Sequence, residues 1–348
     1  MSKETSMLKR PALLLGLLAA CSSGGDTSGD PTGDASEDAA ADLGTDGSSD
    51  GGGDAEVCYD PSLADSTPLS CTPSDSAPAS GPDVARSSTC PASASWVTSV
   101  RGRVLDEAGA PVACAKAQVC VRVAKPARLL CLRPTETALD GSYLVEIPEE
   151  ARCQASSSLR VLGPRVTDAT IYCDIPREPG SSQVDVEQGS VLFSMVPAPG
   201  LATVCGGQQA TVTLDGDLEL KVTPAWMSDG DEDYGLLAAR RVDPTTPGLC
   251  FVATGPTLTH LWALGPEAEI ADPGFRFSAP NDTGLAPGAS LGVYVLGGLT
   301  TTLFGGESVG EGEWVRQGAA RVTDDGTRIE GSGEAAVTYL SWLGLAPE

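Results

Sequence analysis

The chain has 348 residues, a formal net charge of −25 and a single histidine. Fourteen acidic residues and no Lys or Arg lie between Ser22 and Ala85, which argues against nucleic acid or an anionic lipid surface as a partner, because both require basic patches. Gly (41 residues) and Pro (26 residues) are abundant, which favours short strands and turns over helices, and the length suits about two domains.

Residues 1–20 have the composition of a cleavable export signal. Lys3, Lys9 and Arg10 form a basic leader, and an apolar run of Ala, Leu and one Gly follows over residues 12–20. A helix needs about 20 apolar residues to cross a bilayer core, so this run is too short to span one. Its length is typical of the apolar part of a signal peptide, which predicts an exported protein.

The end of this run, Leu18-Ala19-Ala20-Cys21, resembles the lipobox of bacterial lipoproteins. The resemblance implies cleavage before Cys21 and a lipid anchor on its thiol, with several fatty acyl chains such as palmitate, because one chain alone binds a membrane only marginally. Ser22 follows the cysteine, and in that family this residue implies the outer membrane of a Gram-negative bacterium. Both exposure at the cell surface and a periplasmic orientation stay open. The alternative is an ordinary secretory signal followed by a chance cysteine.

Residues 21–56 consist mainly of Ser, Gly, Asp, Ala and Thr, with hardly any apolar side chains. Such a segment cannot bury enough surface to offset its conformational entropy, so we expect a lipidated, disordered acidic tether. Its SGD, TGD and SSD repeats raise calcium binding as an alternative, because calcium prefers carboxylate oxygens. The acids are spaced three or four residues apart without an apolar frame, which favours a solvated spacer.

Eleven cysteines are present, and ten remain if Cys21 carries lipid. An even number in an exported chain predicts up to five disulfides. The chain has no CxxC pair and only one histidine, so zinc-ligand spacing is missing. The pairing stays open, and the disulfide candidates are Cys58, Cys71, Cys90, Cys114, Cys120, Cys131, Cys153, Cys173, Cys205 and Cys250.

Residues 57–94 are rich in Cys, Pro and Ser and show no regular pattern. We expect this irregular segment to be ordered by disulfides, either within itself or to the next domain. From residue 95 apolar and polar residues begin to alternate as in β-strands, and we predict strands at 97–104, 117–123 and 128–133. Asp140-Gly141 predicts a tight turn before another apolar strand.

Residues 95–165 resemble the carboxypeptidase regulatory-like domain in the pattern V-x-G-x-V-x-D-x-x-G-x-P-V, then A-x-V, then T-x-x-D-G-x-Y. The pattern falls on Val100, Gly102, Val104, Asp106, Gly109, Pro111, Val112, Ala117, Val119, Thr137, Asp140, Gly141 and Tyr143. The resemblance implies a transthyretin-like β-sandwich of about seven strands, used as a non-catalytic module on secreted proteins. Cys114, Cys120, Cys131 and Cys153 depart from the family pattern and indicate a variant held by disulfides.

Residues 166–348 are also rich in short, turn-bounded strands, which we predict at 210–214, 218–222, 291–296, 313–322 and 337–343. This half resembles a ZU5-like module of large bacterial surface proteins, which implies a second sandwich and no chemistry. The segments that carry the resemblance are residues 279–281, 284–288, Val293-Tyr294, 312–315, Gly318, 322–326 and Trp342.

Two residues invite a catalytic interpretation. Ser290 lies in Gly288-Ala289-Ser290-Leu291-Gly292, the G-x-S-x-G form of a hydrolase elbow, but that elbow requires a following helix and a later histidine. A strand follows here, and His260 precedes the serine. We therefore expect Ser290 to open a strand and His260 to be a hydrogen-bonded strand residue. A general base for an unrecognised reaction is the alternative for His260.

Asp229, Asp231 and Asp233 place carboxylates at alternate positions of an acidic cluster. They are candidate calcium ligands, although the twelfth position of an EF-hand loop falls on Arg240 and supplies no acid. The alternative is a solvated loop between strands. The five tryptophans include candidates for a sugar-stacking platform, although tryptophans this scattered are more typical of a core.

We therefore predict an all-β protein with two β-sandwich-type domains behind a disordered acidic linker. We expect a non-catalytic binding or structural lipoprotein without an obligate cofactor. Its expected partners are the membrane, through the lipid on Cys21, and a protein or glycan ligand. The alternatives are a carbohydrate- or peptidoglycan-binding protein and a hydrolase whose site leaves no motif.

Overall fold

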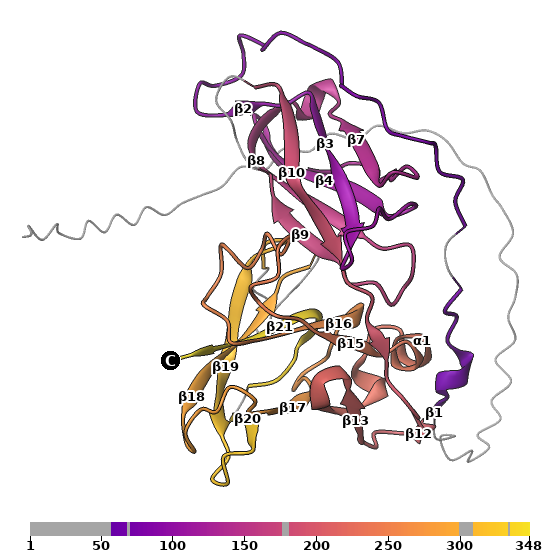
Figure 1. Cartoon of the computed structure of the whole chain (residues 1–348), viewed down its shortest axis with the longest axis vertical. Helices are drawn as coiled ribbons and strands as arrows, with labels where there is room; N and C mark the ends of the chain where they lie inside the picture. The colour runs from indigo at the N-terminus through magenta and orange to yellow at the C-terminus, as the bar shows by residue number, and fades with distance from the viewer. Residues whose placement is uncertain (1–56, 68–69, 176–180, 299–308, 333–334) are drawn as a thin grey trace, which may run out of the picture. The chain divides into compact units, whose positions relative to one another are not determined.

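The computed structural model describes residues 57–67, 70–175, 181–298, 309–332 and 335–348. Within these ranges the chain is built almost entirely of strands, with one α-helix, α1 (Gly230–Gly235), and none long and apolar enough to cross a membrane (Figure 1). Short 3-10 turns occur at Pro61–Leu63, Glu149–Ala151, Asp215–Asp217 and Pro224–Trp226. The all-β prediction is confirmed, whereas the predicted signal, Cys21 and acidic tether lie outside the described residues.

The first β region contains two sheets. Its strands are β2 (Ser95–Trp96), β3 (Ser99–Asp106), β4 (Lys116–Ala124), β5 (Ala127–Cys131), β6 (Thr135–Glu136), β7 (Ser142–Glu146), β8 (Cys153–Leu162), β9 (Ile171–Asp174) and β10 (Gln183–Leu192). One sheet has the order β10-β3-β7. The other has the order β2-β8-β4-β5, with β6 beside β4 and β9 beside β8.

Both sheets turn their apolar faces toward one core. Alternate residues of β4, including Val119 and Val121, are fully buried, as the two-residue period of a strand requires. Val100 of β3 and Val145 of β7 enter the same core from the other sheet. Burial of each such side chain contributes about 2 kcal/mol. The first region is therefore a β-sandwich.

The turn before β7 explains why glycine is needed there. Asp140 Oδ1 accepts a hydrogen bond from the backbone N–H of Ser142 at 3.0 Å, and Gly141 has a φ of 76°. A Cβ at Gly141 would lie 2.5 Å from the carbonyl oxygen of Val104. Only glycine combines the positive φ with this close approach.

The strand pairing carries the first sandwich beyond the boundary expected at residue 165. β9 pairs antiparallel with β8, and β10 pairs in parallel with β3. A parallel pair requires a long crossover connection, so the partner of β3 lies far along the chain and no local pattern identifies it. The sheets of the sandwich end at Leu192.

The second β region is one ten-stranded sheet. Its strands are β11 (Val196–Pro197), β13 (Ala210–Leu214), β14 (Leu218–Val222), β15 (Ala238–Arg241), β16 (His260–Glu269), β17 (Arg276–Pro280), β18 (Ser290–Leu296), β19 (Trp314–Val322), β20 (Arg328–Ser332) and β21 (Tyr339–Pro347). The order is β11-β15-β16-β21-β18-β19-β20-β17-β14-β13. β13 at one end also contacts β15 near the other end, so the sheet curls around its own core. The expected second sandwich is thus a single curled sheet.

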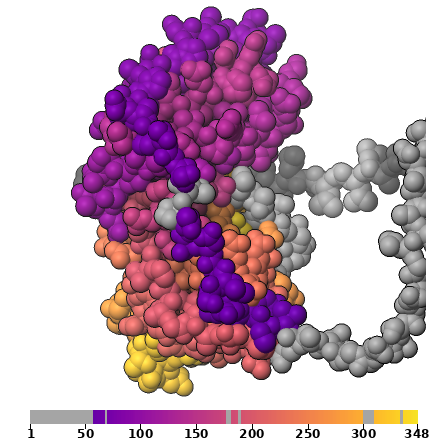
Figure 2. Space-filling view, turned by 90° about the vertical axis from the view of Figure 1, so that its right-hand side faces the viewer, coloured from indigo at the N-terminus to yellow at the C-terminus, as the bar shows by residue number. Residues whose placement is uncertain are grey.

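The described parts of the irregular segment, residues 57–67 and 70–94, lie along the surface of both β regions, as Figure 2 shows in indigo. Its first residues, β1 (Cys58–Tyr59), pair with β12 (Val204–Cys205). Its three cysteines form disulfides to the two β regions, and the ten candidates together make five pairs. The pairs are Cys58–Cys205, Cys71–Cys114, Cys90–Cys153, Cys120–Cys131 and Cys173–Cys250.

Candidate functional site

The outer face of the β4–β8 sheet carries a polar cluster against the curled sheet. Along β8, Leu159 and Val161 are buried in the sandwich core, so the alternate residues Ser158 and Arg160 face the other way. Side chains from β9, β16, β21 and the residues before β19 meet them there. We call this the junction cluster, and its members are Ser158, Arg160, Tyr172, Glu267, Glu311 and Tyr339.

Glu267 is the acceptor at the centre of the junction cluster. Its carboxylate accepts hydrogen bonds from Tyr172 Oη at 2.5 Å, Tyr339 Oη at 2.7 Å and Arg160 Nη2 at 2.9 Å. Burial alone would raise the pKa of Glu267, but the Arg160 charge and these hydrogen bonds outweigh it and hold the pKa below its ordinary value. The carboxylate is therefore charged, buried and fully paired.

Glu311 is the second acid of the cluster and has the opposite character. Ser158 Oγ donates to Glu311 Oε2 at 3.2 Å, whereas Oε1 has no hydrogen-bond partner among the described residues. Burial raises the pKa of Glu311, and the charge of Arg160 does not offset this effect. The pKa values of two neighbouring carboxyl groups are thus shifted in opposite directions, an arrangement also found in acid–base sites.

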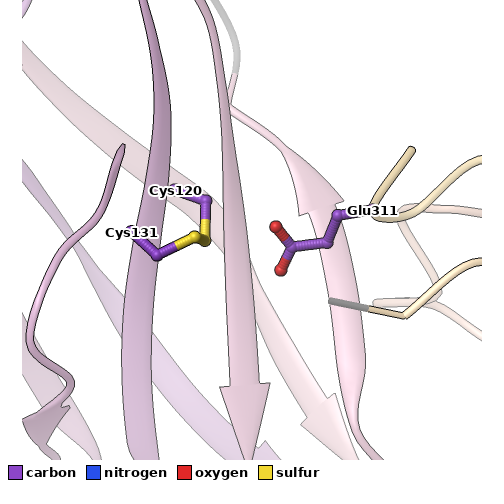
Figure 3. A group of neighbouring side chains, drawn as sticks. All are labelled: Cys120, Cys131 and Glu311. Carbon is purple, nitrogen blue, oxygen red and sulfur yellow. A yellow bond between two sulfur atoms is a disulfide. The ribbon is translucent and has the colours of Figure 1, made fainter. Parts of the chain in front are cut away.

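A disulfide completes the environment of Glu311. Figure 3 shows the Glu311 carboxylate pointing toward the bond between Cys120 and Cys131. Both sulfurs and a Glu311 oxygen lie within 4.8 Å of one another, the one grouping of three metal-type ligand atoms among the described residues. Thiolates bind metals, whereas the sulfurs of Cys120 and Cys131 are joined in a disulfide. The oxidised group is therefore no metal centre.

His260 lies at the start of β16, away from the junction cluster. Its Nδ1 is 2.9 Å from Thr259 Oγ1, and its Nε2 is 2.9 Å from Asp282 Oδ1. Burial lowers the pKa of His260, and the nearby Arg241 charge adds to this effect. The imidazole is fully buried, with Trp262 stacked on it, so no solvent-borne substrate reaches it in this conformation.

Ser290 begins β18, and no helix follows it. Its hydroxyl donates to the carboxylate of Glu348, and no hydrogen bond joins it to His260 among the described residues. The G-x-S-x-G segment is therefore the opening of a strand, as its local sequence predicts, and it lacks the strand-to-helix turn of a nucleophile elbow.

The acidic stretch at 229–233 forms the beginning of α1 instead of the expected loop. Acids in a first helical turn are stabilised by the positive end of the helix dipole. Asp231 Oδ1 accepts from the backbone N–H of Asp60 at 3.0 Å, and Asp233 Oδ2 accepts from the N–H of Asp229 at 2.9 Å. The carboxylates thus bind backbone amides, and they do not converge on a shared point.

Sequence reasoning did not single out any member of the junction cluster. Its residues come from four strands and one loop that are widely separated in the chain. The only sequence feature near the cluster is the alternation of polar and buried residues along β8. Such alternation is common in strands with one exposed face, so it does not mark a site. The tryptophans lie largely in the core: Trp262 and Trp342 are fully buried and the other three are partly buried.

No protein-family model matches the chain, and a search of curated proteins finds no match.

Proposed function

We propose that this protein is an exported, lipid-anchored and non-catalytic lipoprotein that holds a binding or structural β-scaffold at a bacterial surface. The observation that carries the proposal is the attachment of the irregular segment. Cys58 bonds to Cys205 of the second region, and Cys71 and Cys90 bond to Cys114 and Cys153 of the first. Disulfides of this number form and persist in oxidising, exported environments.

The disulfides also suit a tethered protein mechanically. The irregular segment follows directly after the predicted tether, so a pull from the membrane would first reach Cys58. The Cys58–Cys205 bond would pass this load to β12 of the second β region through a covalent link. The segment beyond it is held at two further points, so the scaffold would keep its fold under load.

Glu267 of the junction cluster supports a structural role for this acid. The donors to Glu267 come from the chain itself, and the side chains of Arg160 and Glu267 are only 14% and 16% exposed. A catalytic carboxyl group must contact a substrate, whereas this one is surrounded by its own partners. The resemblances to carboxypeptidase regulatory-like and ZU5-like modules point to the same non-catalytic class.

The anchor is tested in a Gram-negative bacterium that expresses the full chain and a Cys21→Ser variant, both fed a palmitate analogue that can be tagged. We expect label and membrane attachment for the parent protein and neither for C21S. Protease treatment of intact cells should release the parent protein from the surface. An unlabelled parent protein would overturn the anchor.

The non-catalytic assignment needs its own experiment. The released protein is incubated with cell-wall material, a glycan array and panels of glycoside and ester substrates. Retention without turnover is the expected result for a binding protein, and retention on glycans alone would select the carbohydrate-binding alternative. Turnover by the parent protein that is lost in a Glu267→Gln, Glu311→Gln double variant would contradict the proposal.

A further inference from the structure

The Cys120–Cys131 disulfide differs from the other four in what it joins. The two residues lie opposite each other on the antiparallel strands β4 and β5, and they are 11 residues apart in sequence. The other pairs join residues that are 43 to 147 apart. Because the entropy that a disulfide removes from the unfolded chain grows with loop length, this bond contributes least to folding.

The hairpin keeps the two sulfur positions together without the bond. Five register pairs join β4 to β5, from Cys120↔Cys131 to Ala124↔Ala127. Val119 and Val121 fix β4 in the sandwich core on either side of Cys120. Two thiols formed by reduction would therefore remain adjacent and ready to oxidise again.

The two sulfurs differ in access. β5 is the last strand of its sheet, and Leu129 on it is 57% exposed. Cys131 on this edge strand is partly exposed, whereas Cys120 is only 2% exposed. A thiolate from solution would therefore attack Cys131, and Cys120 would leave.

Glu311 lies where the leaving sulfur needs a proton. A Glu311 oxygen is within 4.8 Å of both sulfurs, and its Oε1 has no hydrogen-bond partner among the described residues. The charged groups that act on it are Arg160 and Glu267, which oppose each other, and burial in this environment favours the protonated acid. A protonated carboxyl beside a buried sulfur is suited to general acid catalysis.

We propose that Cys120–Cys131 is a redox-active disulfide that exchanges with an external dithiol, and that Glu311 is its proton donor. The dithiol's thiolate attacks Cys131 Sγ and forms a mixed disulfide. The Cys120–Cys131 bond breaks, and Cys120 leaves with the electron pair and takes the Glu311 proton. The second thiol of the dithiol then attacks the dithiol's first sulfur, which is bonded to Cys131 in the mixed disulfide. Cys131 leaves as a thiolate, and the dithiol becomes a cyclic disulfide. Two electrons pass to the protein, and the proton of the second thiol restores Glu311.

The test reduces the folded, oxidised protein with dithiothreitol at pH 6. Each reduction rate is divided by the concentration of dithiothreitol thiolate at that pH. Samples are quenched with acid, alkylated and mapped by peptide mass spectrometry at each cysteine over time. We expect Cys120 and Cys131 to be labelled before the other eight cysteines. Equal or later labelling of this pair would overturn its assignment as the redox-active disulfide.

The role of Glu311 is tested with Glu311→Gln, which removes the proton and keeps the shape. A general acid typically contributes at least about 100-fold, and we expect a slowing of about tenfold or more because solvent supplies part of the protons. The matched control is Glu313→Gln, an exposed acid two residues away, which should leave the rate unchanged.

Glu311→Asp retains an acid and serves if the glutamine variant perturbs the fold. We expect it to recover most of the rate, with the other four disulfides reduced as in the parent protein. Equal rates for the parent protein and E311Q, or equally slow rates for E311D and E311Q, would overturn Glu311 as the proton donor.

Discussion

Arg160 of β8 and Glu267 of β16 form a buried ion pair that joins the sandwich to the curled sheet, with Nη2 and Oε2 2.9 Å apart. Tyr172 and Tyr339 donate to the same carboxylate, one from each β region. Charges removed from water are stable only when they are paired and hydrogen-bonded, so the pair ties the contact between the two regions to one arrangement.

Glu267→Gln should be strongly destabilising because it leaves the Arg160 charge buried without its counter-ion. The loss of unfolding free energy should be about 3–5 kcal/mol, measured by urea denaturation. Asp185→Asn makes the same chemical change in the exposed pair with Arg101, whose side chains are 44% and 42% exposed, and should cost at most about 1 kcal/mol. Equal losses in the two variants would show that the buried pair does not hold the junction.

Replacing Glu311 should change the unfolding free energy in the opposite direction to replacing Glu267. Burial raises the pKa of Glu311 in the folded protein. The stabilising contribution of this group is therefore fully present below the pKa of the unfolded chain, about 4.3, and is lost as pH rises through the folded pKa. Glu311→Gln should match the parent protein in unfolding free energy at pH 4 and exceed it at pH 8.

Urea midpoints at pH 4, 6 and 8 check this prediction, with Glu313→Gln as an exposed control that should show no such trend. A Glu311→Gln variant that is less stable than the parent protein at pH 8 would contradict it. That result would mean that the charged form of Glu311 is the one that the fold stabilises.

The sandwich could be predicted from sequence because its signals are local. Val119 and Val121 alternate with outward-facing residues, and Asp140-Gly141 has the turn chemistry that β7 requires. The junction cluster could not be predicted from sequence, because the pattern of β8 indicates only that Arg160 faces away from the core. Its partner Glu267 is 107 residues away, and only the packing of two separate sheets brings them together.

The curled sheet and α1 show the same limit. Strands β13, β14, β18 and β19 fall close to their predicted ranges, but their order in the sheet depends on pairings across the whole second region. The acids of α1 are favourable in a first helical turn, yet the helix is six residues long and forms with its Tyr234 side chain fully buried. Packing, which no short segment encodes, selects the helix there.

Two glycines with similar backbone angles should respond differently to alanine. Gly141 and Gly109 have φ values of 76° and 78°, but a Cβ at Gly141 would meet Val104 O at 2.5 Å and one at Gly109 would meet nothing within 4 Å. Gly109→Ala should therefore cost only backbone strain, about 1–2 kcal/mol. Gly141→Ala adds a steric clash and should cost about 2–5 kcal/mol. Equal losses in thermal unfolding would refute the close approach.

The five disulfides should differ in their contribution to stability according to the loops they close. From chain entropy, the Cys58–Cys205 bond should contribute about 5 kcal/mol and the Cys120–Cys131 bond about 3 kcal/mol, because their residues are 147 and 11 apart. Paired Cys→Ser variants, compared by urea denaturation, test the difference. A larger loss for the hairpin pair would indicate that it stabilises the folded junction and would count against its assignment as an exchange site.

The acids of α1 should not bind calcium. The carboxylates of Asp231 and Asp233 accept backbone N–H groups, and withdrawing them would leave the amides of Asp60 and Asp229 without these acceptors. We expect no heat in a calorimetric titration at millimolar calcium and no change in Tm. Asp229→Asn serves as the matched variant, since its exposed side chain makes no hydrogen bond in the described structure. A calcium-dependent rise in Tm that disappears in Asp229→Asn would establish a site there and refute the prediction.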